Sequence, residues 1–237
     1  AAALAALGET NDASIALLLD AVRAHPAHAP YPDPRRNLRA GGGLDLDGPP
    51  DPLPIAVEEV LGLGDDAVPL LAPLVAEGER EERIRVLFAL ARIGARGALR
   101  AALAADEPDV VRVAAACLVW LGETGDAELR VLAAHFGARE VVVGVALSPD
   151  AATDLLEKAG AAAVPALLDH ARAEFKRENP GHNGEAVFVS VPAVFQDVLE
   201  LCVRIGAPAV PALEAARDDP AVGDLATEAL RQIAAAK

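Results

Sequence analysis

The histidines are the residues of this sequence whose side chains could bind a metal or move a proton near neutral pH. His25 and His28 have a spacing that could share a metal, but they lie among prolines without a cysteine or a third clear ligand nearby. His135 and His170 fall in helical stretches, with no carboxylate at a spacing that suggests a preset catalytic pair. We therefore predict solvent-facing histidines and no metal site.

Two loop segments carry the remaining patterns that could do chemistry. The segment "ENPGHNGE" around His182 combines Asn, His and Glu, but segments of this composition are usually hydrophilic turns. The glycines of "RAGGGLD" lack the lysine and the strand-to-helix context of a phosphate-binding loop. The sequence therefore predicts no catalytic residue, no enzymatic activity and no cofactor.

A recurring phrase defines the elements that would position any site. It consists of an apolar residue, a glycine, a few small or polar residues and an apolar run. Glycine after a helix end supplies the left-handed conformation, and Asp or Pro nearby opens the next helix, so each phrase predicts a corner between two helices. The clearest copies are "LGLGDDAVPLLAPL" from Leu61 and "IGAPAVPALEAA" from Ile205. The marker glycines of all copies are Gly8, Gly64, Gly94, Gly122, Gly160 and Gly206.

The segments before these corners repeat apolar residues at steps of three and four, which is the helical period, as in "EERIRVLFALARIG" and "VPAVFQDVLELCVRIG". Together with "DEPDVVRVAAACLVWLG", whose Asp109, Val111, Arg112 and Ala114 follow a "D-x-x-VR-x-AA" pattern, they resemble HEAT-like repeats of the phycobilisome-lyase type. The resemblance covers about residues 51–237. It implies an all-α solenoid, an armadillo-like superhelix of about five to six antiparallel helix pairs, with the second helices lining a concave face.

Two segments interrupt this rhythm. Residues 25–54 are rich in proline, contain a glycine triplet and show little apolar periodicity, so they predict an irregular connection after an N-terminal helical repeat remnant at 1–24. The HEAT-like solenoid is then expected over 55–237, with an insertion at about 177–190 between two helices. Such an insertion should project from one edge.

Comparing the predicted second helices with one another identifies a candidate binding patch. Two columns one turn apart hold mostly polar or charged residues, with pairs such as Asp154 with Lys158 and Glu200 with Arg204. In the two central repeats Phe88, Ala116 and Trp120 take their place. Exposed aromatics beside arginine are common anchors of protein interfaces. We therefore predict partner-binding residues Trp120, Phe88, Arg92, Arg85 and Arg112.

Two other interpretations of this patch stay open. The connection at 25–54, with its prolines and Tyr31, could fold over Phe88 and Trp120. The rings could also be ordinary core residues placed on the surface by a misjudged register. Solvent quenching of Trp120 fluorescence separates these cases.

Charge and cysteine usage limit the partners. The formal charge of −15 repels phosphate backbones and anionic lipid surfaces, so we expect neither nucleic acid nor membrane as a partner. Cys117 and Cys202 sit in apolar helical stretches, where a buried thiol is expected. No long apolar span is present, and the first residues lack the basic region of a signal peptide. A cytoplasmic protein, with a monomer as the working expectation, follows.

The predicted function is a non-enzymatic scaffold that binds a partner protein on the concave face of a HEAT-like solenoid. Because some proteins with phycobilisome-lyase-type repeats handle a bilin, the resemblance also implies an alternative, a tetrapyrrole-binding or lyase-like protein. An absorbance titration with bilin or haem distinguishes the two.

Overall fold

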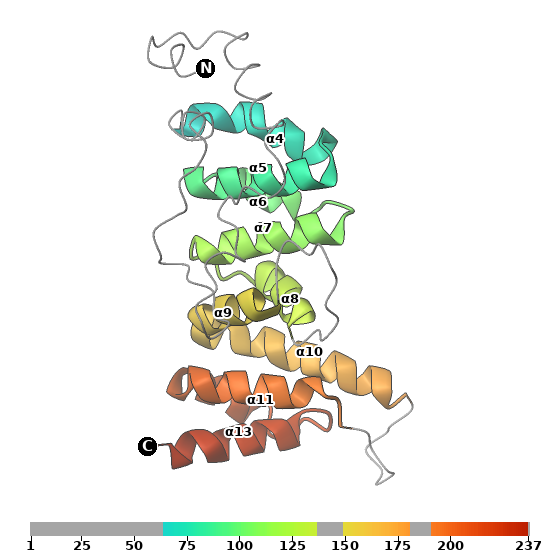
Figure 1. Ribbon diagram of the computed structural model, residues 1–237. Coiled ribbons are helices and arrows are strands. Elements are labelled where there is room, and N and C mark those ends of the chain that lie inside the picture. Colours follow the sequence, from blue (N-terminus) through green and yellow to red (C-terminus); the bar gives the residue numbers. More distant parts are fainter. Residues whose placement is uncertain (1–63, 137–148, 181–190, 237) are drawn as a thin grey trace. The chain divides into compact units, whose positions relative to one another are not determined.

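The computed structural model describes residues 64–136, 149–180 and 191–236, and the regular elements in these ranges are helices (Figure 1). The all-α prediction is therefore confirmed for the described residues. No helix in these ranges is both long and apolar enough to cross a lipid bilayer. The α-helices are α4 (Val68–Glu77), α5 (Arg80–Ile93), α6 (Arg96–Ala102), α7 (Pro108–Trp120), α8 (Asp126–His135), α9 (Pro149–Ala159), α10 (Ala163–Glu178), α11 (Val194–Ile205), α12 (Val210–Ala215) and α13 (Gly223–Ala235).

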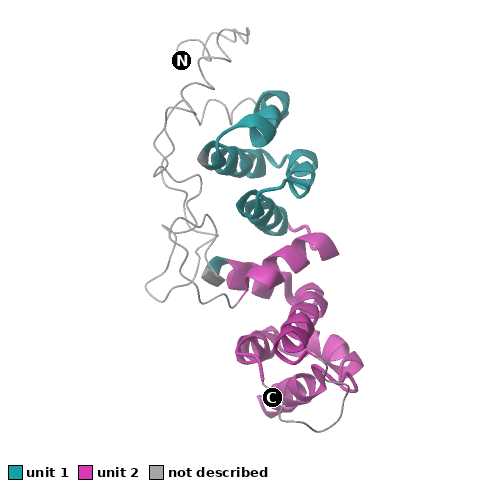
Figure 2. Cartoon of the chain, turned by 90° about the vertical axis from the view of Figure 1, so that its right-hand side faces the viewer, with its two compact units in different colours: residues 1–121, 142–151 teal, residues 122–141, 152–237 magenta. Residues whose placement is uncertain are grey.

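The described residues divide into two compact units (Figure 2). The first contains residues 64–121 and 149–151, and the second contains 122–136, 152–180 and 191–236. Helices α4 to α7 therefore belong to the first unit. Helices α8 and α10 to α13, with most of α9, belong to the second.

Helix pairs build the core of the first unit. Helix α5 packs against α4 and α7, and α6 packs against α7. Helices this short are marginal alone in water, so their stability comes from the apolar faces that neighbours cover. The largest fully buried side chains of this unit are Leu71, Leu87, Leu90, Leu99 and Leu118.

The second unit follows the same scheme. Helix α10 packs against α8 and α11, and α13 packs against α11 and α12. Alanines such as Ala166, Ala171 and Ala229 are also buried, which lets neighbouring helices approach closely. The largest fully buried side chains here are Leu129, Leu132, Leu156, Leu167, Leu201 and Leu213.

The predicted glycine corners are confirmed at Gly94, Gly122, Gly160 and Gly206, each of which joins two described helices, whereas the residues before Gly64 lie outside the described ranges. The φ angles are +57° at Gly64, +82° at Gly94, +85° at Gly122, +60° at Gly160 and +73° at Gly206, and no other residue type has positive φ in the described ranges. An L side chain is disfavoured in this region, which explains why each corner carries glycine. Gly8 lies outside the described residues.

The corners fall into two kinds that the sequence distinguishes. Where "AVP" follows the glycine, a short 3₁₀ helix leads into the next α-helix: η1 (Gly64–Ala67), η2 (Gly160–Ala162) and η3 (Ala207–Ala209). Proline suits the start of a helix, because its missing N–H has no intrahelical acceptor there. The corners at Gly94 and Gly122 lack this motif and reach α6 and α8 without a 3₁₀ turn.

An arginine links successive helix pairs in each unit. In the first unit, Arg83 Nε donates to the carbonyl oxygen of Val75 at 2.5 Å, and Arg83 forms an ion pair with Glu107 at 3.1 Å. In the second, Arg172 Nε donates to Asp219 Oδ2 at 2.8 Å. These contacts hold the loops between helices against the neighbouring pair.

One predicted boundary differs from the structure. Helix α10 continues to Glu178, so its last turn includes Arg177, where the insertion was expected to begin. The prediction was early because "RAEFKRE" is polar yet still has the spacing of a helix whose buried residue is Phe175. Residues 1–24, 25–54 and 181–190, with His25, His28 and His182, lie outside the described residues.

Candidate functional site

The two aromatic residues of the predicted patch lie in the first unit. Phe88 is on α5 and Trp120 is the last residue of α7, and these two helices pack together. Both rings are half-buried and pack against the hydrophobic core of this unit. Part of each ring therefore serves the core and part remains open to solvent. The connection at 25–54, the expected cover, lies outside the described residues.

Two of the predicted arginines accompany Phe88. Arg85, Phe88 and Arg92 follow one another on α5 at steps of three and four residues, which places them on one face of the helix. Arg85 is half-buried and Arg92 is exposed. Arg92 also lies in the last turn, where a cation is stabilised by the helix dipole.

Arg112 occupies a different place. Its guanidinium pairs with Asp109 at 2.7 Å and donates to the carbonyl oxygen of Pro108 at 3.1 Å. Asp109 also accepts a hydrogen bond from Arg80 Nε of α5 at 2.8 Å. Arg112 lies eight residues before Trp120, about 12 Å along the helix axis. The structure thus joins Arg112 to the start of α7 rather than to the indole.

The surface pattern predicted from the comparison of second helices is found only in part. Ala116 is 5% exposed, so the surface predicted between Phe88 and Trp120 is interrupted by a core position. The predicted pair of Glu200 with Arg204 is also wrong: Arg204 pairs with Glu157 of α9 at 3.2 Å, and Glu200 accepts from Gln196. No local pattern indicates this exchange of partners, because Glu157 belongs to a neighbouring helix.

Burial is the main cause of the pKa shifts of one histidine and both cysteines in the described ranges. Partial burial lowers the pKa of His170, against the opposing effects of Glu174 and of a hydrogen bond to the backbone of Phe136. Burial raises the pKa of the Cys117 and Cys202 thiols to about 12, and both are free, as predicted. Within the described ranges, no group of three or more His, Cys, Asp or Glu side chains could hold a metal ion.

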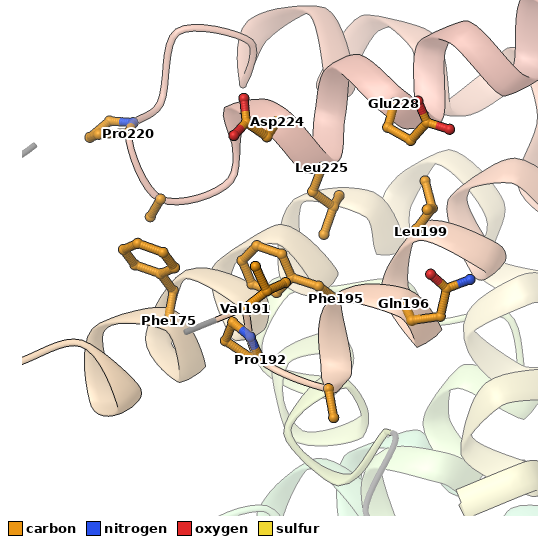
Figure 3. A pocket seen from close by; sticks show the side chains of 12 residues that line it. Phe175, Val191, Pro192, Phe195, Gln196, Leu199, Pro220, Asp224, Leu225 and Glu228 are labelled. Atoms are coloured by element: carbon orange, nitrogen blue, oxygen red, sulfur yellow. The ribbon is translucent and has the colours of Figure 1, made fainter. Parts of the chain in front are cut away.

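A surface groove in the second unit is a stronger candidate that the sequence did not predict (Figure 3). Its volume is about 610 Å³, within the range of ligand-binding sites. Phe175 of α10 and Phe195 of α11 both line it and stack side by side, with ring centroids 6.2 Å apart and an interplanar angle of 28°. Val191, which also lines the groove, is 71% exposed, the one large hydrophobic residue so exposed in the described ranges.

The α13 side of this groove is acidic. Asp224 and Glu228 lie one helical turn apart, with Leu225 between them (Figure 3). Arg231 donates to Glu228 at 2.8 and 2.6 Å, and these hydrogen bonds, with one from Gln232, lower the pKa of Glu228 to about 2. Glu228 is therefore ionised at neutral pH.

Asp224 differs from Glu228 because its side chain makes no hydrogen bond or ion pair with another described residue. It is exposed and lies in the first turn of α13, where the free N–H groups favour a negative charge. No lysine or arginine is among the described residues that line the groove. The groove is therefore an apolar surface with an acidic edge.

Only one sequence signal could have indicated this groove. Phe175 and Phe195, two of the five phenylalanines, flank the predicted insertion on either side. Their meeting depends on how α10 and α11 pack, which no local period encodes.

Comparison of the chain with family models, with curated proteins and with solved structures finds no match. The resemblance to HEAT-like repeats therefore stays a prediction.

Proposed function

We propose that this chain is a non-enzymatic scaffold, in which HEAT-like helix pairs stack as an α-solenoid and hold a partner protein on the second helices. The observation that carries the proposal is the repetition of one structural unit. Four corners with a positive-φ glycine, at Gly94, Gly122, Gly160 and Gly206, join successive described helices, and these helices bury small and branched apolar residues. Repeats of this kind produce extended surfaces suited to binding other proteins.

In the proposed mechanism, Phe88 and Trp120 are the apolar anchors on the partner-binding surface. Arg85 and Arg92, which share a face of α5 with Phe88, would orient the partner. Arg112 enters the proposal as a residue that fixes the start of α7, because its guanidinium already pairs with Asp109. The charge of −15 favours a partner with a basic rim, since complementary charge speeds association and excludes other partners.

Partner capture by the full chain tests this proposal. Proteins retained by the unaltered chain and by Arg92→Glu are compared by quantitative mass spectrometry, with Arg100→Glu as the control. Arg92 and Arg100 are both exposed arginines in the last turn of a helix of the first unit, so neither change should disturb the core. Loss of one partner with Arg92→Glu alone is the expected result. An identical set of retained proteins for all three would reject this binding surface.

The fluorescence of Trp120, the only tryptophan, supplies an independent measurement. Because the indole is half-buried, we expect acrylamide to quench it to a degree between that of a free indole and that of a buried one, and less once the partner is bound. Complete protection in the free protein would remove Trp120 from the proposed surface.

A further inference from the structure

We propose that the groove of the second unit binds a short peptide segment that combines one or two bulky apolar side chains with a lysine or arginine. This inference rests on the proposed scaffold function and names a second binding surface, separate in its residues from Phe88 and Trp120. It follows from the shape, the lining and the charge of the groove.

The apolar part of the recognition comes from rings that already face each other. Phe175 is 8% exposed, whereas Phe195 is half-buried, so Phe195 offers more of its ring to the open space that both residues line. Leu225, on the opposite side, is 5% exposed. An apolar side chain entering between Phe195 and Leu225 would contact preordered surfaces, which lowers the entropic cost of binding.

The size of the groove favours a peptide segment over a folded domain. A volume of about 610 Å³ accommodates a few side chains. The exposed Val191 extends the apolar surface beyond the rings. A chain lying along the groove would cover Val191 while its anchoring side chain enters the space beside Phe195.

Charge determines which peptide fits. Asp224 lies at the edge without an intramolecular partner among the described residues, and Glu228 contributes a second ionised carboxylate one turn away. The guanidinium of Arg231 offsets part of the charge of Glu228, so Asp224 is the principal contact for an incoming cation. A lysine or arginine next to the apolar anchor would pair with Asp224, whereas an acidic peptide would be repelled by both carboxylates.

A peptide-display selection on the full chain tests the proposal, with random twelve-residue peptides as the probe. We expect enriched peptides to combine a Leu, Phe or Trp with a nearby Lys or Arg. The dissociation constant of an enriched synthetic peptide should rise at least about tenfold for Asp224→Lys and for Val191→Glu. Both residues are exposed, so these variants should fold normally, which circular dichroism checks.

The matched control is Asp218→Lys, which reverses the charge of another exposed aspartate that does not line the groove. It should leave the dissociation constant unchanged within about twofold, because exposed charges beyond close range are screened by salt. Equal weakening by Asp218→Lys and Asp224→Lys would show a diffuse charge effect and overturn the proposal. Enrichment of acidic peptides would also overturn the proposal. The same holds if none of the three variants changes the dissociation constant of the enriched peptides.

Two other occupants are outcomes of the same experiment. If the groove binds a second copy of the chain, light scattering will show a dimer that Val191→Glu dissociates. If residues 181–190 of the same chain occupy it, peptide binding will require their replacement by a glycine–serine linker. Either result overturns the peptide proposal.

Failure here is distinguishable from failure of the scaffold function. Loss of partner capture by Arg92→Glu, together with a groove that selects no peptide, would leave the scaffold proposal standing and reject this site.

Discussion

The aromatic residues of the two units show how differently the same residue type can be used in one repeated architecture. In the first unit, Phe88 and Trp120 pack against the hydrophobic core, and Phe88 shares one face of α5 with Arg85 and Arg92. In the second, Phe175 and Phe195 stack at a surface groove edged by carboxylates. The first pair stands out in a comparison of repeats, and the second does not. Residues that are unusual in a column of repeats are thus not the only aromatic residues that line an open surface.

The reason lies in what each ring contacts. Trp120 is the last residue of α7, and its half-buried indole packs against the hydrophobic core with part of the ring still open to solvent. Phe195 lies in the first turn of α11, where the chain enters the helix after residues 191–193 and where the groove stays open. Binding capacity depends on this local geometry more than on residue identity.

The largest effect that would test this two-unit description concerns the cysteines, since each unit contains one. Because burial raises both thiol pKa values from 9.0 to about 12, the thiolate fraction at pH 8 should be lower by about a thousandfold. We expect Cys117→Ala and Cys202→Ala variants, each retaining one thiol, to react with a disulfide reagent only on unfolding.

Reactivity across a urea series then compares the units. If the two thiols become reactive at different urea concentrations, the units unfold separately. If they become reactive together, the units form one cooperative structure. Rapid reaction of either thiol in the absence of urea would contradict the buried environments.

The next effect separates a core ring from a surface ring. Trp120→Ala should lower the free energy of unfolding by about 2–3 kcal/mol, because it removes a large side chain that packs against buried residues. Arg92→Ala, on the exposed face of the neighbouring helix, should change it by less than about 0.5 kcal/mol. Urea denaturation measures both. If Trp120→Ala leaves the free energy of unfolding unchanged, the indole does not contribute to the core. The contrast between the units would then disappear.

The smallest effect concerns the ion pair that supports the second unit near the groove. The pKa of Asp219 is lowered: partial burial opposes ionisation, but hydrogen bonds from the backbone of Ala221 and Val222 and the guanidinium of Arg172 outweigh it. Asp219→Asn should therefore cost about 1 kcal/mol at pH 7, because it removes one charge from a partly buried pair.

The pH dependence of this cost has a defined sign. A carboxyl group whose pKa is lower in the folded state stabilises the fold at pH values above its pKa in the unfolded chain, which is about 4 for Asp. The difference between the unaltered protein and Asp219→Asn should be constant from pH 7 to about pH 5 and shrink as the pH falls further. Asp218→Asn, next to it in the chain and exposed, is the control and should change the free energy of unfolding at pH 7 by less than about 0.5 kcal/mol. A difference that grows on acidification would contradict the assignment.

Much of the fold followed from local patterns. Apolar residues at helical steps predicted helices before the corners at Gly94, Gly122, Gly160 and Gly206, and the structure has α5, α7, α9 and α11 there. The glycines could be recognised because positive φ excludes other side chains almost regardless of what surrounds them. The buried cysteines were predictable for a similar reason, since their apolar helical neighbours are adjacent in sequence.

The surface was harder to predict. Three surface predictions differed from the structure: the exposure of Ala116, the ion-pair partner of Arg204 and the position of Arg112. All three depend on neighbouring helices. Side chains of charged residues reach several ångströms, so their partners are chosen by packing rather than by spacing along one helix.

By itself the sequence determined where helices turn and which faces are apolar, because backbone conformation and helical period are properties of short segments. Only the tertiary structure decided which aromatic rings remain accessible and which carboxylates stay without a partner, because these properties depend on helices that are distant in sequence. The groove beside Phe195 and Asp224 exists for that reason and has no signature in any single repeat.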